Sequence, residues 1–139
     1  MTNNTDCRDQ KTVLIVEDQP LLRQTMCEFL QDAFPDHNFL DAADGASALQ
    51  ASNAYRPVLV LMDKCLPDAD GIDLTARLKA LYPTIQVIVV SYRSGEVYEQ
   101  RALAAGARAY LAKDRLATDL ISEVAAAIGV APATDMGTS

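Results

Sequence analysis

The sequence is poor in the residues that stabilise cross-linked or zinc-binding domains. Its three cysteines, Cys7, Cys27 and Cys65, are widely spaced and form no CxxC pair. An odd number of cysteines without paired spacing predicts neither a disulfide framework nor a zinc site. The single histidine, His37, has no evident nucleophile or metal-ligand partner near it in the sequence. We therefore expect no role for His37 or the thiols in the chemistry of this protein.

Long apolar runs and clustered positive charge are also missing. The longest apolar runs are about five residues, far below the ~20 that span a bilayer, and the polar N-terminus lacks the order of a signal peptide. We therefore expect a cytoplasmic protein without membrane contact. Lys and Arg number 12 against 19 Asp and Glu, a net charge of −7. Because phosphate contacts need clustered cations, we predict no direct nucleic-acid contact by this chain.

The length and composition are those of one globular domain. The chain has 139 residues, half of them hydrophobic, and a domain of this size buries roughly two thirds of its unfolded surface. Residues 1–11 are polar and unpatterned, whereas residues 129–139 are rich in Ala, Thr, Gly and Pro. These compositions predict a flexible leader at 1–11, one domain at 12–128 and a flexible tail or linker at 129–139.

Five strand patterns alternate with five helix patterns along the domain. The predicted strands are residues 12–16, 39–42, 58–63, 86–91 and 109–112. The predicted helices are residues 20–34, 46–54, 72–81, 95–105 and 116–128, with Ser94 as the cap of the fourth helix. This alternation predicts an α/β domain with a parallel sheet. The first, third and fourth strands are the most apolar, which predicts the doubly wound order 2-1-3-4-5 of a flavodoxin-like (βα)5 fold.

Polar residues stand at the ends of four of these strands. Glu17 and Asp18 follow the first strand, Asp63 ends the third, Ser91 ends the fourth and Lys113 follows the fifth. Some have an ordinary explanation alone, such as a helix N-cap for Asp18 or a surface charge for Lys113, whereas Asp63 at the end of a buried strand favours a function by itself. Because the carboxyl ends of parallel strands share one edge, we expect these side chains to meet where the winding direction reverses. The shared edge favours a functional site.

The residue types at this edge indicate phosphoryl chemistry. Three carboxylates in close proximity repel one another, so either one of them keeps a proton or a divalent cation lies among them. Oxygen ligands with room for water and a phosphate favour Mg²⁺. We expect the Asp63 carboxylate to attack phosphorus and form an aspartyl phosphate. Lys113 would serve as a point cation and Ser91 as a hydrogen-bond donor to a phosphoryl oxygen.

Several motifs, in order along the chain, resemble the receiver domain of two-component response regulators. They are Val13-Leu14-Ile15-Val16-Glu17-Asp18, Leu61-Met62-Asp63 with Pro67 and Asp70-Gly71, Val89-Val90-Ser91, and Ala109-Tyr110-Leu111-Ala112-Lys113. The Lys113-Asp114 pair, together with residues 105–110, looks most like the branch of the family that carries a C-terminal helix-turn-helix domain.

The resemblance implies a metal site, a donor and a switch. The implied Mg²⁺ ligands are Asp18, Asp63, the backbone carbonyl of Cys65, and Glu17 largely through water. A histidine kinase or phosphotransfer protein would donate the phosphoryl group to Asp63. Ser91 and Tyr110 would form a switch pair that alters the face of the fourth helix, fifth strand and last helix. The protein is then a signalling receiver and not an enzyme. As a receiver, it would act on an output protein or domain, or on a second copy of itself.

Alternatives remain open at this point. A flavodoxin-like cofactor binder shares the fold, but Glu17 and Asp18 would repel a phosphate from its first loop. A haloacid-dehalogenase-like phosphatase also uses a strand-end Asp, yet it typically has a second Asp where this chain has Cys65. A receiver fold that no longer accepts phosphate would act only as an interaction module. The chain is either a single-domain regulator or a receiver separated from a DNA-binding output domain.

Overall fold

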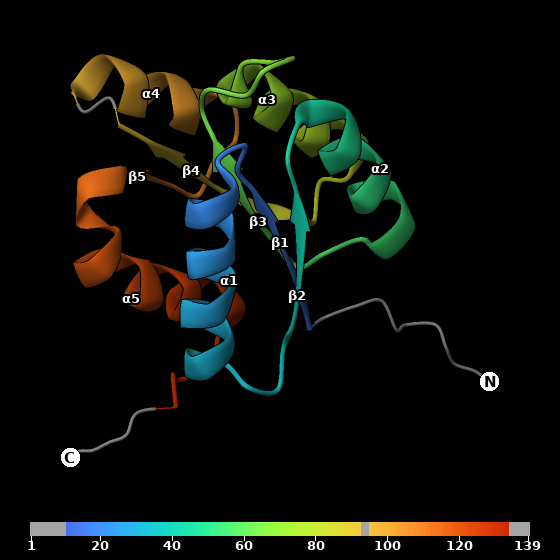
Figure 1. The fold of residues 1–139 in the computed structure, drawn as a ribbon. Coiled ribbons are helices and arrows are strands. Elements are labelled where there is room, and N and C mark those ends of the chain that lie inside the picture. Colours follow the sequence, from blue (N-terminus) through green and yellow to red (C-terminus); the bar gives the residue numbers. More distant parts are fainter. Residues whose placement is uncertain (1–10, 93–94, 134–139) are drawn as a thin grey trace.

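The computed structural model describes residues 11–92 and 95–133, and its centre is a five-stranded parallel sheet (Figure 1). The strands are β1 (Thr12–Val16), β2 (Asn38–Ala42), β3 (Leu59–Asp63), β4 (Gln86–Ser91) and β5 (Ala109–Ala112). They lie in the order β2-β1-β3-β4-β5. The predicted doubly wound, flavodoxin-like order is therefore confirmed.

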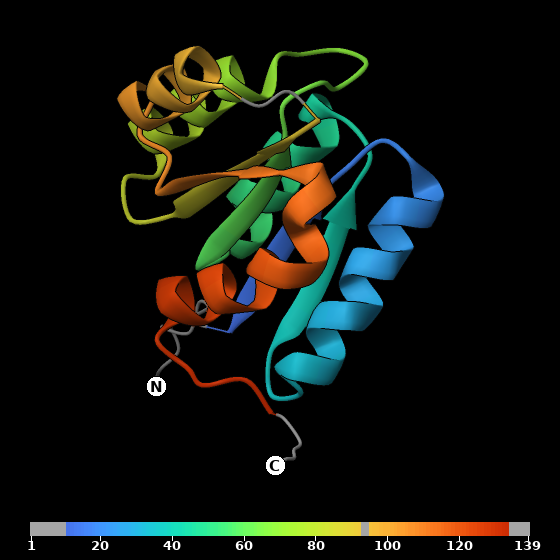
Figure 2. The ribbon, with the colours of Figure 1, turned by 90° about the vertical axis from the view of Figure 1, so that its left-hand side faces the viewer.

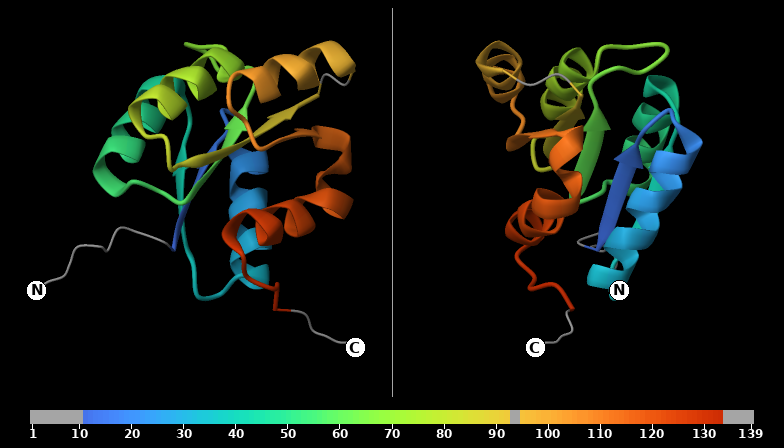
Figure 3. Two further views of the ribbon diagram at one scale, coloured as in Figure 1. Left: turned by 180° about the vertical axis from the view of Figure 1, so that it is seen from behind. Right: turned by 60° about the vertical axis from the view of Figure 1, so that its left-hand side comes forward.

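Helices cover both faces of the sheet. They are α1 (Pro20–Ala33), α2 (Gly45–Tyr55), α3 (Gly71–Leu81), α4 (Glu96–Ala104) and α5 (Leu116–Ile128), with a short 3-10 turn, η2 (Lys113–Arg115), before α5. Helices α1 and α5 lie on one face, and α2, α3 and α4 lie on the other (Figures 2 and 3). Among the described helices, none has the length and hydrophobicity that a membrane span requires.

The central strands are buried on both faces because their apolar residues alternate between two cores. Val13 and Ile15 of β1 pack in the core beneath α1 and α5. Leu14 and Val16 pack in the core beneath α2, α3 and α4. The same alternation occurs in β3 and β4, as the side-chain period of a strand requires. The two cores hold the sheet rigid on both sides, which fixes the positions of the residues at its carboxyl edge.

Two predictions concern residues at the margins of the described chain. Ser94, the predicted cap of α4, lies outside the described residues; Gly95 occupies the N-cap position instead, with a φ of 120° that favours glycine. The flexibility of the leader and tail stays a prediction. In the described part of the tail, the backbone N–H of Ala133 donates to the carbonyl oxygen of Ala33 at the end of α1, at 2.7 Å.

His37 is a structural residue in the turn between α1 and β2. Its side chain is 6% exposed, and its ring meets the Phe34 ring edge-on, with the centroids 6.2 Å apart. Nδ1 has no hydrogen-bond partner among the described residues. Burial, followed by the nearby charge of Lys11, lowers the pKa of His37 below its ordinary value of 6.5. The imidazole therefore stays neutral at physiological pH.

Replacing His37 with Gln, which has no titratable group, should change how the free energy of unfolding depends on pH below 6.5. The folded pKa lies below the unfolded value of 6.5, so the stability held above that pH is lost as the pH falls towards the folded pKa. In urea unfolding across this range, the free energy of unfolding of wild type minus that of His37→Gln should decrease with falling pH. A difference independent of pH would contradict a neutral, buried His37.

Candidate functional site

Three carboxylates meet at the carboxyl edge of β1 and β3, as the sequence predicts. Glu17, Asp18 and Asp63 each offer an oxygen atom within 4.8 Å of the others, and we call these three residues the acidic rim. Val16 pairs with Met62 across the two strands, so the residues that follow them lie at the same level. Glu17 is 1% exposed and Asp63 is 3% exposed, whereas Asp18 is exposed. Two of the carboxylates are thus almost completely removed from solvent.

Lys113 brings a positive charge to the acidic rim. Its Nζ lies 2.9 Å from Oε1 of Glu17 and 3.3 Å from Oδ1 of Asp63, with the Lys113 side chain 5% exposed. The ring of Tyr92 lies beside the same ammonium group, 4.7 Å from Nζ to the ring centroid. Burial alone lowers the pKa of Lys113, but the hydrogen bond to Glu17 and the charge of Asp63 outweigh it and raise this pKa above its ordinary value. Lys113 therefore stays charged.

The start of α1 holds Glu17 in place. Oε2 of Glu17 accepts the backbone N–H of Gln19 at 3.1 Å, and its carbonyl oxygen accepts a hydrogen bond from the Arg23 guanidinium at 2.8 Å. The N-cap position of α1 is Gln19, followed by Pro20. The simple explanation of Asp18 as the N-cap is therefore wrong, and its carboxylate belongs to the acidic rim instead.

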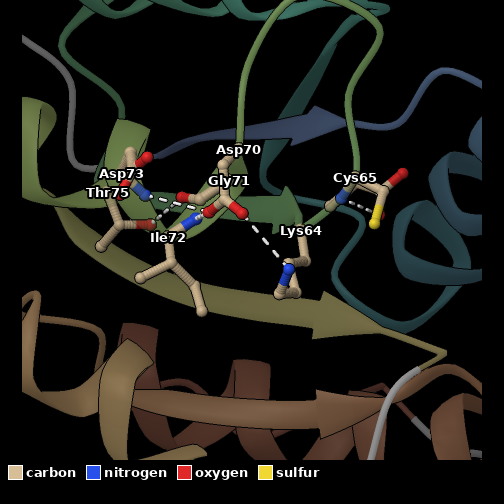
Figure 4. A network of polar contacts seen from close by, with 8 residues as sticks. Lys64, Cys65, Asp70, Gly71, Ile72, Asp73 and Thr75 are labelled. Atoms are coloured by element: carbon tan, nitrogen blue, oxygen red, sulfur yellow. Dashed lines mark hydrogen bonds and ion pairs between the residues drawn. The ribbon is translucent and has the colours of Figure 1, made fainter. Parts of the chain in front are cut away.

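The Asp70-Gly71 pair fixes the loop that follows Asp63 (Figure 4). Oδ1 of Asp70 accepts the backbone N–H groups of Ile72 and Asp73, at 2.8 and 3.2 Å, and so caps α3. Gly71 lies so close to β3 that a Cβ atom there would overlap the carbonyl oxygen of Asp63. Only glycine permits this approach, and it keeps the backbone of Asp63 tied to the first turn of α3.

The environment of Asp63 favours its protonated form. Burial is the largest cause, followed by the negative charge of Glu17, and together they raise the pKa of Asp63 to about 7. Lys113 and the backbone N–H of Cys65, 3.2 Å from Oδ1, act in the opposite direction. Of the two ways to relieve the repulsion, a retained proton is therefore available to the acidic rim without any cation.

The donor set of the acidic rim also fits a divalent metal. Three carboxylates with oxygen atoms this close are hard ligands, which Mg²⁺ and related cations prefer over the nitrogen and sulfur ligands of zinc sites. A cation there would relieve the same repulsion that otherwise retains the proton on Asp63. The acidic rim is thus consistent with a metal site.

The remaining predicted residues are Ser91, Cys65 and Tyr110, which lie in β4, in the loop after β3 and in β5. Ser91, 2% exposed, ends β4 beside β3. Cys65 is exposed and contacts Asp63 through its backbone N–H. Tyr110 is half-buried in β5 and packs against the core beneath α2, α3 and α4. Strand alternation places Ser91 on the same face as Val89, the partner of Tyr110 across the strands.

Two residues near the site were not predicted from the sequence. Lys64 forms an ion pair with Asp70 at 3.2 Å, and its Nζ lies 5.0 Å from the centroid of the Tyr98 ring in α4. Asp68 accepts hydrogen bonds from the N-terminus of α2. The contacts of Lys64 with Tyr98 and of Asp68 with α2 join residues far apart in the sequence, and no local pattern of residue types marks them.

The fold and the acidic rim define an α/β domain with a candidate binding site at the point where the winding of its sheet reverses. The sequence model of the response regulator receiver domain matches residues 13–125. The chain belongs to this family. A receiver domain is a module of two-component signalling and not an enzyme, and the acidic rim lies at the position expected for its phosphorylation.

The chain is also similar in sequence to parts of named proteins. Over 105 residues the chain is 44% identical to protein-glutamate methylesterase/protein-glutamine glutaminase 3 of Anaeromyxobacter dehalogenans, covering 74% of this chain and 30% of that protein. It is 31% identical to the transcriptional regulatory protein PdtaR of Mycobacterium tuberculosis, covering 91% of this chain and 61% of that protein. The chain thus spans less than two thirds of the length of these relatives.

The fold of the chain is similar to that of a solved response regulator structure. The DNA-binding response regulator of the LuxR family from Staphylococcus aureus has a TM-score of 0.78 with this chain at 25% identity, covering 85% of this chain and 98% of that one. This similarity agrees with the predicted resemblance to the branch of receivers with helix-turn-helix outputs.

Replacing Asp63 with Asn should stabilise the metal-free protein at neutral and alkaline pH. The folded pKa of about 7 exceeds the ordinary value of 3.8, so the stability linked to the proton is present below pH 3.8 and lost as the pH rises through about 7. Urea unfolding in a chelator should show that the advantage of Asp63→Asn over wild type grows by about 1–2 kcal/mol between about pH 5 and about pH 8. An advantage that stays constant would rule out a retained proton.

Proposed function

We propose that Asp63 accepts a phosphoryl group from a histidine kinase or a phosphotransfer protein, and that the chain acts as a signalling switch. The observation that carries this proposal is the burial of the Asp63 carboxylate beside two further carboxylates, with the Lys113 ammonium 3.3 Å from Oδ1. Such a site concentrates the charges that phosphoryl transfer needs, because the reaction depends on positioning and charge neutralisation.

The proposed reaction is a displacement at phosphorus. A carboxylate oxygen of Asp63 forms the new bond to phosphorus, while the bond to the donor histidine nitrogen breaks and its electron pair stays on that nitrogen. Lys113 stabilises negative charge on the phosphoryl oxygens, and Ser91 donates a hydrogen bond to one of them. Since only the deprotonated carboxylate attacks, loss of the proton from Asp63 is a required step.

We assign the cation to Mg²⁺ and its ligands to the acidic rim and the neighbouring loop. The proposed ligands are Asp18, Asp63, the backbone carbonyl of Cys65, and Glu17 largely through water. When bound, Mg²⁺ neutralises the carboxylates and favours the deprotonated form of Asp63. The backbone of Cys65 is already tied to Asp63 by its N–H, which supports its inclusion in this set.

The proposed output face comprises α4, β5 and α5. All residues of α4 are described, and only Ala102 among them is buried, so α4 is the helix least anchored to the body. Phosphorylation adds about −1.5 to −2 units of charge at Asp63 and shifts an existing equilibrium between two positions of this face. Ser91 moves towards the phosphoryl group, and Tyr110 turns inward behind it.

The partner that reads this face is an output protein or domain, or a second copy of the chain. An attached DNA-binding domain and a separate partner protein are both compatible with a receiver that spans only part of its relatives. We propose that the phosphoryl transfer takes place in the cytoplasm, as the sequence predicts. Any contact with DNA would be made by the output partner.

Incubation with a small phosphodonor such as acetyl phosphate and Mg²⁺ should add one phosphoryl group to the wild-type chain, as measured by intact mass. Asp63→Asn should abolish the addition because it removes the nucleophile. Asp119→Asn, which removes a carboxylate of α5 outside the acidic rim, is the matched control and should be modified like wild type. Folded wild type that stays unmodified would overturn the phosphoacceptor role and leave the interaction module as the better interpretation.

Tyr110→Ala should leave phosphorylation intact but uncouple it from the output face. In wild type, the phosphodonor should change hydrogen exchange of the α4 amides, or dimerisation measured by sedimentation, and this change should shrink in Tyr110→Ala. Tyr55→Ala, a substitution at an exposed tyrosine of α2, controls for loss of an aromatic ring. An unchanged response of α4 and of dimerisation in Tyr110→Ala would remove Tyr110 from the mechanism.

A further inference from the structure

The side chain of Asp68 joins the loop between β3 and α3 to the start of α2 by hydrogen bonds. Within this loop, Cys65 pairs with Asp70 in an isolated bridge, and the backbone N–H of Leu66 donates to the carbonyl of Ala69 at 3.2 Å. At the tip of the loop, the two carboxylate oxygens of Asp68 accept the backbone N–H groups of Gly45 and Ala46, at 2.7 and 3.1 Å. Asp68 therefore connects the loop that carries Cys65 to the first turn of a helix that precedes it by about 20 residues.

The approach of the loop to α2 is close enough to restrict the residue at position 45. A Cβ atom on Gly45 would lie 3.1 Å from Cβ of Ala69 and 3.1 Å from Oδ1 of Asp68. Gly45 is buried, and its backbone N–H forms the shorter of the two hydrogen bonds. Since the N-terminus of a helix also carries partial positive charge, the Asp68 carboxylate is favoured there electrostatically.

Helix α2 has a cap of its own and does not depend on Asp68 for one. Asp44 occupies the N-cap position, and its Oδ1 accepts the backbone N–H of Ser47 at 2.8 Å. The two carboxylates thus bind the same helix end with different consequences. The hydrogen bond of Asp44 stays within the first turn of α2. The hydrogen bonds of Asp68 connect α2 to the loop after Asp63.

We propose that Asp68 is a positioning residue for the metal site, which holds the backbone carbonyl of Cys65 in the orientation that Mg²⁺ binding requires. This inference rests on the proposed Mg²⁺ site. A carboxylate ligand can adjust by rotation about its side-chain bonds, but the direction of a carbonyl is set entirely by the backbone of its loop. The base of the loop is fixed by Asp70 and Gly71, and Asp68 fixes the tip.

The test compares Mg²⁺ affinity, by isothermal titration calorimetry, among variants of the two carboxylates at the start of α2. Asp68→Ala removes both hydrogen bonds to the helix and should weaken Mg²⁺ binding roughly tenfold, in the range of residues that orient metal ligands from outside the ligand set. Asp68→Asn keeps one acceptor oxygen and should fall between Asp68→Ala and wild type. Asp44→Ala removes the same charge from the same helix end and should stay within about twofold of wild type, because the hydrogen bond of Asp44 to Ser47 stays within α2 and does not reach the loop.

Hydrogen exchange provides the second measurement. The amides of residues 64–70 should exchange faster in Asp68→Ala than in wild type, while the same amides in Asp44→Ala should match wild type. Circular dichroism confirms that each variant is folded. Since Asp68 is exposed, its replacement leaves both cores intact.

Each outcome distinguishes the inference from the proposal beneath it. Folded wild type that does not bind Mg²⁺ would overturn the proposed metal site itself. Wild type that binds Mg²⁺, with Asp68→Ala at the same affinity, would overturn only the positioning role. Equal weakening in Asp68→Ala and Asp44→Ala would overturn it as well, because the effect would then come from charge or helix capping and not from the loop.

Discussion

Repulsion among three carboxylates at one edge of a sheet is the constraint on which the rest of the structure depends. Doubly wound order brings β1 and β3 together, so Glu17 and Asp63 are buried side by side with Asp18 next to them. In the unfolded chain Asp63 is far from Glu17 and Asp18 in the sequence, so folding brings its charge to theirs. The folded protein relieves it with the ammonium group of Lys113 and with a proton on Asp63, whose pKa rises to about 7. Charge balance at this edge is therefore incomplete in the free protein, and a cation or a phosphoryl group changes that balance directly.

The backbone around the acidic rim is held by the first turns of three helices. The N–H of Gln19 before α1 binds Glu17, Asp68 binds the start of α2, and Asp70 caps α3. Gly71 and Gly45 allow the close approaches that accompany two of these contacts. As a result, Glu17 and the loop that follows Asp63 are held by hydrogen bonds to backbone N–H groups, in addition to the packing of the two hydrophobic cores.

The fold and much of the site follow from local patterns in the sequence. Runs of residues that are apolar on both faces of the strand identified β1, β3 and β4 as central. Every predicted helix and strand boundary lies within one residue of the observed one. The convergence of Glu17, Asp63 and Lys113 followed from the shared carboxyl edge of parallel strands. Asp18 as a possible helix cap was wrong, because Gln19 occupies that position and residue preference alone could not decide between neighbours. The contacts of Asp68 with Gly45 and of Lys64 with Tyr98 could not be predicted, since they depend on tertiary placement of loops and not on periodicity.

The free energy that attaches α4 to the domain is small compared with the free energy of unfolding of the domain as a whole. Its only buried side chain is Ala102, and a methyl group corresponds to about 0.8 kcal/mol of burial, far less than the roughly 5–15 kcal/mol that holds a domain folded. A displacement of α4 would therefore cost only a small part of the total stability. Its exposed residues, Val97 at 66% and Leu103 at 45%, add little to the cores. Substitutions at the surface of α4 can thus change the side chains that this helix presents to solvent, while the acidic rim and the fold that supports it remain as they are.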